Sequence, residues 1–287
     1  MKSSLDIFRP GRVLLYGLII FFAGLTVLPF AWMVCASLKT QADFFTSRFL
    51  PTGDGIFGIA WDRLTLHQFV RLFTELPVAR ALLNSVFFSA VISLGATFFS
   101  AAGGYALSKF DFRGREWVTT FTIGTVVLPS ALLLGPGFET LYHLGLVDSY
   151  AGVLLPGLAP AFGLYLFRQA MINSLPTDII ESARIDGCGE IRIFFQIVLP
   201  IIRPMISAYL IIVFIGVWNN FITPQIVLQS PELHPLSVAI FSLRGLYSDD
   251  NSLIMAGTLV SIAPVMILFL VLQKEFISGL TTGAVKG

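Results

Sequence analysis

The residue types that catalysis needs are sparse in this sequence. Its three histidines, His67, His143 and His234, are scattered without the spacing of metal ligands, and we interpret them as surface residues. No Gly-x-x-x-x-Gly-Lys-[Ser/Thr] loop occurs, so the chain cannot bind and hydrolyse ATP in the P-loop manner by itself. The polar segments that interrupt this otherwise apolar chain are therefore the more informative features.

The most informative polar segment follows a proline. Pro176 suits the first turn of a helix, and Asp178 would lie near the positive end of the helix dipole. The helix is predicted to run to about Asp186, because Gly187 can take the left-handed conformation of a C-terminal cap. Glu190 then opens a second helical segment. The segment is thus predicted to be a short helix, a glycine corner and a second helix.

Two interpretations of the first of these helices stay open at this point. Three turns are too few for independent stability in water, so the helix needs a surface to pack against. Ile180, beside the small residues Ala183 and Gly187, offers a compact knob for the groove of a cytosolic partner. The alternative is a solvated helix, or one that lies among lipid headgroups.

The elements that must position this segment are helices in a membrane. Of the 287 residues, 55% are apolar and 12% are charged, against roughly 25% charged residues in a soluble domain. Six uncharged runs each reach, the fourth barely, the ~20 residues that a helix needs to cross the hydrocarbon core. They cover residues 13–38, 81–108, 117–138, 149–167, 204–231 and 251–273. The alternating pattern of a β-barrel is absent, so we predict an all-α polytopic membrane protein with six transmembrane helices.

Lysine and arginine counts orient these helices. If both termini and the loops after spans two and four share one side, that side carries twelve of the 18 Lys and Arg residues. The positive-inside rule then makes both termini and the loop around Gly187 cytoplasmic. Cys35 and Cys188 fall on opposite faces of the membrane, which leaves no disulfide or metal pair. A net charge of +1 argues against nucleic acid as a partner.

We predict three parts along the chain. Residues 1–80 hold the first transmembrane helix and a long extracytoplasmic loop, in which residues 64–76 should form a short helix at the membrane surface. Residues 81–273 form a core of five helices, with the polar loop at about 172–200. Residues 274–287 form a cytoplasmic C-terminal tail.

Small and polar residues within the predicted spans indicate where another helix packs closely or where a solute contacts the chain. Residues 101–104, AAGG, would let another helix lie close to span two. The candidates for a translocation path are amide and hydroxyl side chains of span five, because buried amides in a span face protein or a water-filled cavity. They are Ser207, Asn219, Asn220 and Gln225. Hydrogen bonding between helices explains these side chains equally well.

The spacing within the polar loop matches a known motif. Glu181-Ser182-Ala183, three residues, Gly187, nine residues, then Ile197-x-Leu199-Pro200 resembles E-A-A-x3-G-x9-I-x-L-P, found in permease subunits of binding-protein-dependent ABC importers. The one departure is Ser182, where the motif has alanine. Further stretches resemble the carbohydrate-uptake branch, and more narrowly the second permease subunit of maltose-type systems. They are SLKT at 37–40, Asn84-Ser85, YALSKFDFRGR at 105–115, GVWNNF at 216–221 and GLTTGAVKG at 279–287.

This resemblance implies a type I ABC importer permease fold with a cytoplasmic coupling helix in the loop at 172–200. In the family, this helix lodges in a cleft of a dimeric cytosolic ABC ATPase, which binds ATP and Mg²⁺, so that this chain needs no cofactor of its own. The other implied partners are a second homologous permease subunit, an extracytoplasmic solute-binding protein, a carbohydrate substrate and the lipid bilayer. The implied location is the cytoplasmic membrane of a bacterium or archaeon, the inner membrane in a Gram-negative host.

The resemblance also implies roles for individual residues. The positions that couple to the ATPase are Pro176, Glu181, Ser182, Ala183, Asp186, Gly187, Leu199 and Pro200. The tail residues that would contact the ATPase are Gly279, Gly283 and Lys286.

Two other classes of function remain as alternatives. An ion-gradient-driven secondary transporter of a small polar solute would need ionisable residues at mid-membrane, which the six uncharged runs do not offer. A membrane-embedded enzyme would need a nucleophile and base, or metal ligands, within the bilayer, and no histidine lies in the spans. The sequence therefore favours a transport subunit over both.

Overall fold

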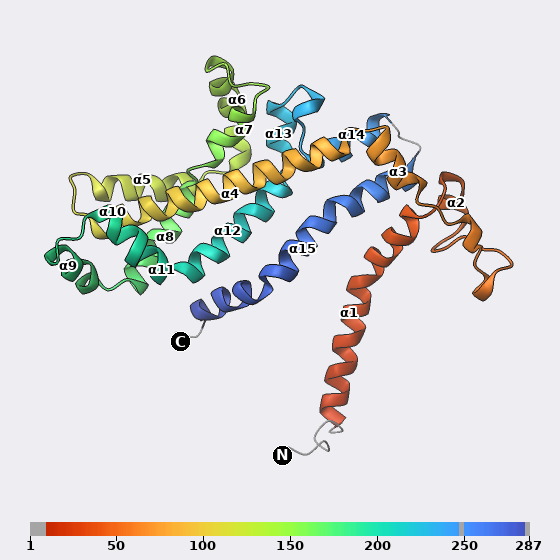
Figure 1. Ribbon diagram of the computed structural model, residues 1–287, viewed down its shortest axis with the longest axis horizontal. Coiled ribbons are helices and arrows are strands. Elements are labelled where there is room, and N and C mark those ends of the chain that lie inside the picture. The colour runs from red at the N-terminus through yellow and green to blue at the C-terminus, as the bar shows by residue number, and fades with distance from the viewer. Residues whose placement is uncertain (1–9, 247–249, 285–287) are drawn as a thin grey trace. The chain divides into compact units, whose positions relative to one another are not determined.

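The computed structural model describes residues 10–246 and 250–284 and builds them almost entirely from helices (Figure 1). In that part of the chain, extended pairing is limited to an isolated bridge between Thr52 and Ile59. The predicted all-α class is confirmed. The all-α class follows from the long apolar runs, because a helix pairs its backbone N–H and C=O groups with one another and needs no water to do so.

Contacts divide the chain into two compact units. The first comprises Met1–Pro77 and Ile240–Ala263, and the second comprises Val78–Ala239 and Pro264–Gly287. The boundaries predicted at residues 80 and 273 concern topology in a membrane, and they stay predictions.

The first unit begins with a long apolar helix and continues with short helical turns. A short helix, α3, forms within the predicted range of 64–76, and its location at the membrane surface stays a prediction. The elements in chain order are α1 (Pro10–Ser37), α2 (Gln41–Thr46), η2 (Ile56–Gly58), η3 (Trp61–Arg63) and α3 (His67–Thr74).

Buried and paired charges hold the loop of the first unit in place. Lys39 is fully buried, and its Nζ donates to the backbone oxygen of Ser47 at 2.8 Å. Desolvation lowers the pKa of this ammonium group. Arg71 forms an ion pair with Asp250, directly before helix α15 (Asn251–Ala284). The loop is therefore fixed to the start of the last helix by polar contacts as well as by packing.

The second unit is organised around α4 (Val78–Lys109), which lies alongside α8 and α12 (Figure 1). Helix α14 (Leu236–Leu246) leads from this unit into the first. The other elements are α5 (Arg115–Val127), η4 (Ser130–Leu133), α6 (Leu134–His143), α7 (Tyr150–Gly157), α8 (Ala161–Ser174), α9 (Thr177–Ile185), α10 (Glu190–Ile193), η5 (Phe194–Val198), α11 (Leu199–Ile201), α12 (Arg203–Trp218), α13 (Ile222–Val227) and η6 (Pro231–Leu233).

Glycines let α4 and α8 approach each other closely, as the AAGG stretch predicted. A Cβ atom added to Gly104 would lie 2.8 Å from the backbone nitrogen of Arg168 and 2.9 Å from the carbonyl carbon of Phe167. From the side of α8, a Cβ on Gly163 would collide with the Ser100 hydroxyl of α4. The close approach of the two backbones leaves no room for side chains at these positions.

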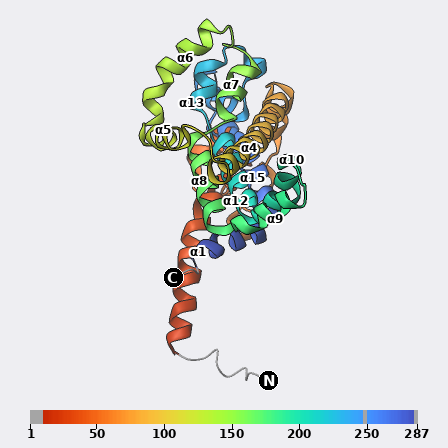
Figure 2. The same cartoon turned by 90° about the vertical axis from the view of Figure 1, so that its left-hand side faces the viewer.

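Four stretches of the described chain are long and apolar enough to cross a membrane. They are Gly11–Ser37, Val78–Lys109, Tyr150–Ser174 and Asn251–Leu270. Two bent pairs bring the count to six if each pair is a single span. The first pair bends by 100° between Arg115–Val127 and Ser130–His143, which is visible between α5 and α6 in Figure 2. The second pair bends by 81° between Glu190–Ile201 and Arg203–Trp218. Pro129 lies at the first bend, and a proline favours such a bend because it lacks a backbone donor.

The prediction that the fifth apolar run, residues 204–231, forms a single helix is wrong. Helix α12 ends at Trp218 and α13 begins at Ile222. Asn219 is the C-cap of α12, and its Nδ2 donates to the backbone oxygen of Ile215 at 3.0 Å. Asparagine ends helices readily because its side chain competes for backbone hydrogen bonds. Apolarity alone did not reveal this break.

Candidate functional site

The polar loop (residues 172–200) begins with the short helix α9. Pro176 precedes the helix as its N-cap residue, with φ −60°, and Asp178 lies in the first turn. The helix ends at Ile185, one residue before the predicted end. The start and the end that the sequence predicted are therefore confirmed to within one residue.

A glycine corner closes α9. Gly187 has φ +81°, the left-handed conformation predicted for it. The amide of Cys188 donates to Ala183 O at 2.9 Å, and the amide of Gly187 donates to Arg184 O at 3.0 Å. This pair of bonds is the Schellman arrangement, which satisfies the last carbonyls of a helix. The chain then turns sharply, and α10 begins at Glu190 as predicted.

The second segment of the loop is less regular than the single helix predicted for it. After α10 the backbone forms a π-helical turn, η5, and then the short helix α11. The 81° bend follows at Ile202. Prolines at positions 200 and 204 remove backbone donors on either side of this bend, so the helix cannot continue straight through it.

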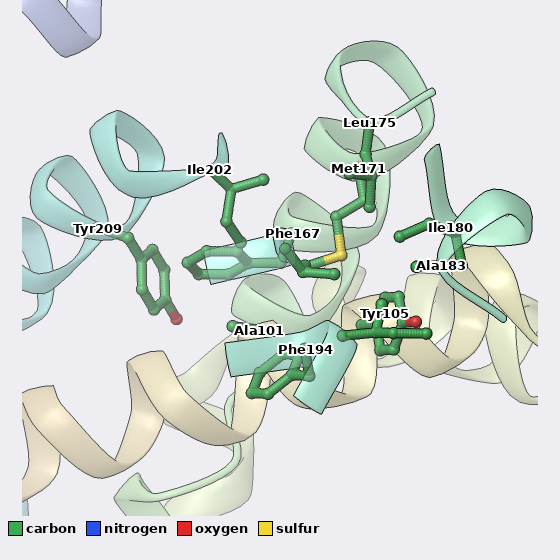
Figure 3. Packing of buried hydrophobic residues seen from close by; sticks show 12 residues of the cluster. Ala101, Tyr105, Phe167, Met171, Leu175, Ile180, Ala183, Phe194, Ile202 and Tyr209 are labelled. Atoms are coloured by element: carbon green, nitrogen blue, oxygen red, sulfur yellow. The ribbon is translucent and has the colours of Figure 1, made fainter. Parts of the chain in front are cut away.

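The buried face of α9 contradicts one prediction. Ile180, the predicted knob for a partner's groove, is fully buried within the chain itself, and Ala183 is buried beside it. Both belong to a cluster with Met171, Leu175 and Tyr105, shown in Figure 3. The knob prediction is wrong because Ile180 points inward, where it anchors α9 to α8 and α4.

The outward surface of the loop is formed by other residues. Ile185 at the end of α9 is 86% exposed, and Ile191 on α10 is 78% exposed. The two isoleucines lie on either side of the glycine corner. Glu181, Ser182 and Asp186 are exposed as well, and Ser182 Oγ donates to Asp178 O at 2.8 Å. Sequence reasoning missed the two isoleucines because each is a single apolar residue next to charges, and only the position of the corner brings them out together.

A partly buried polar cluster joins the glycine corner to α4. The Tyr105 hydroxyl donates to Glu190 Oε2 at 2.8 Å, and Arg184 Nε donates to Glu190 Oε1 at 2.6 Å. The Arg184 guanidinium also lies 5.7 Å from the centroid of the Phe110 ring. Glu190 is thus held by one residue of α4 and one of α9. Charge-assisted bonds of this kind are the stronger class of hydrogen bond.

The start of the polar loop is tied to the end of α4. Lys109 Nζ donates to Leu175 O at 2.6 Å and to Thr177 Oγ1 at 3.1 Å. The bond to Leu175 satisfies a carbonyl at the C-terminal end of α8, where a cation is favourable. Together with the Tyr105 cluster, these bonds fix both sides of α9 to α4.

The remaining residues assigned by the motif lie further along the chain. Leu199 packs, half-buried, against the hydrophobic cluster under α9, and Pro200 is exposed in α11. In the tail, Gly279 and Gly283 fall within α15, which continues without a break to Ala284. Lys286 lies outside the described residues.

The four candidates for a translocation path do not form one cluster. Ser207 is half-buried near the start of α12, about 18 Å along the helix from Asn219. Asn219 and Gln225 are exposed. Asn220 lines a partly open pocket of about 200 Å³, together with Ser85 of α4, Val153 of α7 and Thr223 of α13.

Replacing Gly187 by alanine is expected to loosen the corner locally. An L-residue pays about 1–2 kcal/mol in the left-handed region, which corresponds to about five- to thirtyfold faster amide exchange in residues 183–190. Gly189 is a matched control, because its φ is −72° and a Cβ there meets nothing within 4 Å. Equal exchange in the Gly187→Ala and Gly189→Ala proteins would contradict the role of the left-handed conformation.

Comparison with known proteins identifies the family. A family model described as "Binding-protein-dependent transport system inner membrane component" matches residues 97–277, which include the entire polar loop. The chain belongs to this family. The permease resemblance seen in the polar loop is thereby confirmed.

Individual relatives of this permease extend the similarity over almost its whole length. It is 34% identical over 268 residues to the arabinooligosaccharides transport system permease protein AraQ of Halalkalibacterium halodurans, covering 93% of this chain and 94% of that protein. It is 31% identical over 271 residues to the lactose transport system permease protein LacG of Rhizobium radiobacter, covering 94% and 95%.

A solved structure shows the same fold. The crystal structure of a bacterial ABC transporter involved in the import of the acidic polysaccharide alginate aligns with a TM-score of 0.77 at 22% identity. The alignment covers 96% of this permease and 99% of that chain. The helices of this chain are thus arranged as in a chain of that transporter.

Proposed function

We propose that this chain is a permease subunit of an ATP-driven, binding-protein-dependent importer of a carbohydrate. It forms half of the translocation pathway with a second, homologous permease subunit, and its polar loop docks on a dimeric cytosolic ABC ATPase. ATP and Mg²⁺ bind to that ATPase, so this chain carries no cofactor. An extracytoplasmic solute-binding protein delivers the solute from the other side of the membrane. Family membership supports this function over an ion-gradient-driven transporter.

One observation carries the docking role. Ile185 and Ile191 expose apolar side chains on a rigid corner, while Ile180 on the same helix is fully buried in the chain's own core. A short helix held from behind in this way presents a defined shape to a partner and loses little entropy on binding. Glu181, Ser182 and Asp186, which precede or follow Ile185 by at most four residues, expose polar groups beside it. An apolar centre with a polar rim is typical of a protein interface.

The orientation follows from this docking role. The loop faces the cytoplasm, as the lysine and arginine distribution predicts, and both termini lie on that side. The C-terminal residues Gly279, Gly283 and Lys286 then lie on the ATPase side of the membrane, where they reach between its subunits. The protein is a multi-pass protein of the cytoplasmic membrane, with up to six spans.

The substrate class rests on the relatives. Those named above are permeases for arabinooligosaccharides and for lactose, and both match this chain over more than nine-tenths of its length. We assign a carbohydrate to this importer on that basis. Within this subunit, Asn220 is the best-placed contact for a solute hydroxyl, since it lines the cavity between α4, α7 and α13. Ser207, Asn219 and Gln225 remain further candidates for the path.

Labelling of Cys188 tests docking and orientation together. In a Cys35→Ser background, Cys188 is half-buried at the glycine corner, so a bound ATPase should shield it. With a membrane-impermeant maleimide, we expect labelling of inverted vesicles and none of intact cells. Stripping the ATPase with urea should raise the labelling rate about tenfold, whereas Cys35 in a Cys188→Ser background should not respond. Labelling from outside intact cells, or an unchanged rate after stripping, would refute the proposal.

A further inference from the structure

We propose that α4 is the rigid link that connects the ATPase-docking loop to the segment at residues 228–236 on the opposite face of the membrane. The inference rests on the function proposed above, which puts the ATPase at one end of this helix. It assigns positioning roles to Tyr105 and Asn84, which lie near opposite ends of α4. In Figure 1, α9 and α10 lie at one end of α4, and α13 lies towards the other.

At the loop end, the contacts come from two turns of α4. Tyr105 is 3% exposed and donates its hydroxyl to Glu190, which Arg184 also holds. One turn later, Lys109 donates to Leu175 O and Thr177 Oγ1. The polar loop is thus bound at its start and at its corner to the same helix. A displacement of α9 by the ATPase must therefore move the end of α4, or break these bonds.

At the other end, Asn84 holds a segment that is distant in sequence. Its Nδ2 donates to Glu232 O at 2.9 Å and to His234 O at 3.0 Å, while its Oδ1 accepts from the Tyr150 hydroxyl at 2.8 Å. Asn84 is 5% exposed, so its amide group depends on these three bonds for its hydrogen-bond partners. Breaking them leaves backbone carbonyls unpaired, which keeps the segment attached to α4.

Neighbouring residues strengthen the same attachment. The Ser85 hydroxyl accepts from the amide of Leu236 at 2.7 Å. Asp148, before α7, accepts from Ser230 Oγ at 2.5 Å and from the amides of Ser230 and Gln229. These bonds hold the pKa of Asp148 below its ordinary value, and the bond from the Ser230 hydroxyl has the largest effect. The 228–236 segment is therefore fixed at both of its ends, and its centre, η6, is presented outward.

The helix between these two attachments is straight enough to transmit a displacement. Asn84 and Tyr105 are about 32 Å apart along it, close to the ~30 Å thickness of the hydrocarbon core. Among the candidate spans of the described chain, α4 alone has neither an internal proline nor a sharp bend. Contiguous packing and hydrogen bonds of this kind are the physical means by which distant sites become coupled.

A cysteine reporter on the 228–236 segment tests the link without knowledge of the solute. Glu232 is exposed, and it contributes only its backbone oxygen to Asn84. In the purified complex with its ATPase, carrying Glu232→Cys, Cys35→Ser and Cys188→Ser, the maleimide reaction rate is measured with and without a non-hydrolysable ATP analogue and Mg²⁺. We expect the analogue to change this rate about fivefold or more, the lower range of allosteric coupling.

Variants at either end of α4 are expected to remove that response. Tyr105→Phe and Asn84→Ala should each reduce the analogue-dependent change to less than about twofold. In the double variant, the analogue-dependent change in the reaction rate should be no smaller than in the more affected single variant, because both substitutions interrupt the same link. The controls Tyr142→Phe and Asn173→Ala, at exposed positions, should keep the full response. If Tyr105→Phe complexes do not assemble, Glu190→Gln tests the same contact from the loop side.

The outcomes separate this inference from the function on which it rests. A full response in the Tyr105→Phe or Asn84→Ala complex would overturn the link through α4. So would an unmodified complex that hydrolyses ATP but shows no response at position 232. A chain that binds no ATPase under any condition would instead overturn the proposed function, and this inference with it.

Discussion

The double substitution Ile185→Asp and Ile191→Asp is expected to abolish carbohydrate uptake and binding of the ATPase. Both side chains are largely exposed in the isolated chain, at 86% and 78%, so the change should leave its fold intact. Burial of an isoleucine stabilises a complex by about 1.5–3 kcal/mol, and the two together correspond to a factor of about 10²–10⁴ in affinity. Affinity of the detergent-solubilised permease for the purified ATPase measures this directly.

An isoleucine outside the polar loop provides the matched control. Ile56 is 72% exposed in the loop between α1 and α3, which is predicted to lie on the other face of the membrane. Ile56→Asp makes the same chemical change and should leave ATPase affinity and uptake within about twofold of the unmodified protein, as expected for a surface substitution. Retained ATPase binding in the double variant would show that these isoleucines are not the docking contact.

Adding one methyl group to Gly104 is expected to destabilise the folded permease. Its Cβ would lie within 3 Å of backbone atoms of Phe167 and Arg168, which cannot move aside without separating α4 from α8. Overpacking of this kind costs about 1–3 kcal/mol. Gly104→Ala should therefore lower the midpoint of thermal unfolding in detergent and the yield of folded protein in the membrane.

Gly124 of α5 supplies a control in which the same substitution should not lower the midpoint of thermal unfolding. A Cβ added there meets nothing within 4 Å. Alanine is favoured over glycine in a helix by about 0.5–1 kcal/mol, so Gly124→Ala should leave the unfolding midpoint unchanged or raise it slightly. Two glycines in neighbouring helices thus respond oppositely to the same change. A Gly104→Ala protein as stable as the Gly124→Ala protein would contradict the close approach of α4 and α8.

Local chemistry made the polar loop predictable from the sequence. The start of α9 after Pro176, the left-handed Gly187 and the start of α10 at Glu190 all depend on residues next to one another in the chain. Caps and turns follow such short-range rules. The same holds for the AAGG stretch, whose small residues permit a close neighbour wherever it comes from. Motif spacing added the family, which the comparisons confirmed.

The sequence did not predict where the long apolar runs end or bend. The apolar run at 204–231 contains a helix end at Trp218, because Asn219 and Asn220 bind backbone groups instead of continuing the span. The two bent helix pairs could not be foreseen in their angles either. Composition reports whether a segment tolerates lipid, but it does not report where the backbone turns.

The sequence by itself determined the helical class, the family and the helix–glycine–helix form of the polar loop, because each depends on composition or on residues close in the chain. Only the tertiary structure decided which isoleucines of the polar loop are buried: Ile180 lies in the core, whereas Ile185 and Ile191 are exposed. It also decided that Tyr105 meets Glu190 and that Asn84 meets Glu232. Those pairs are 85 and 148 residues apart, and only the packing of α4 against its neighbours brings them together.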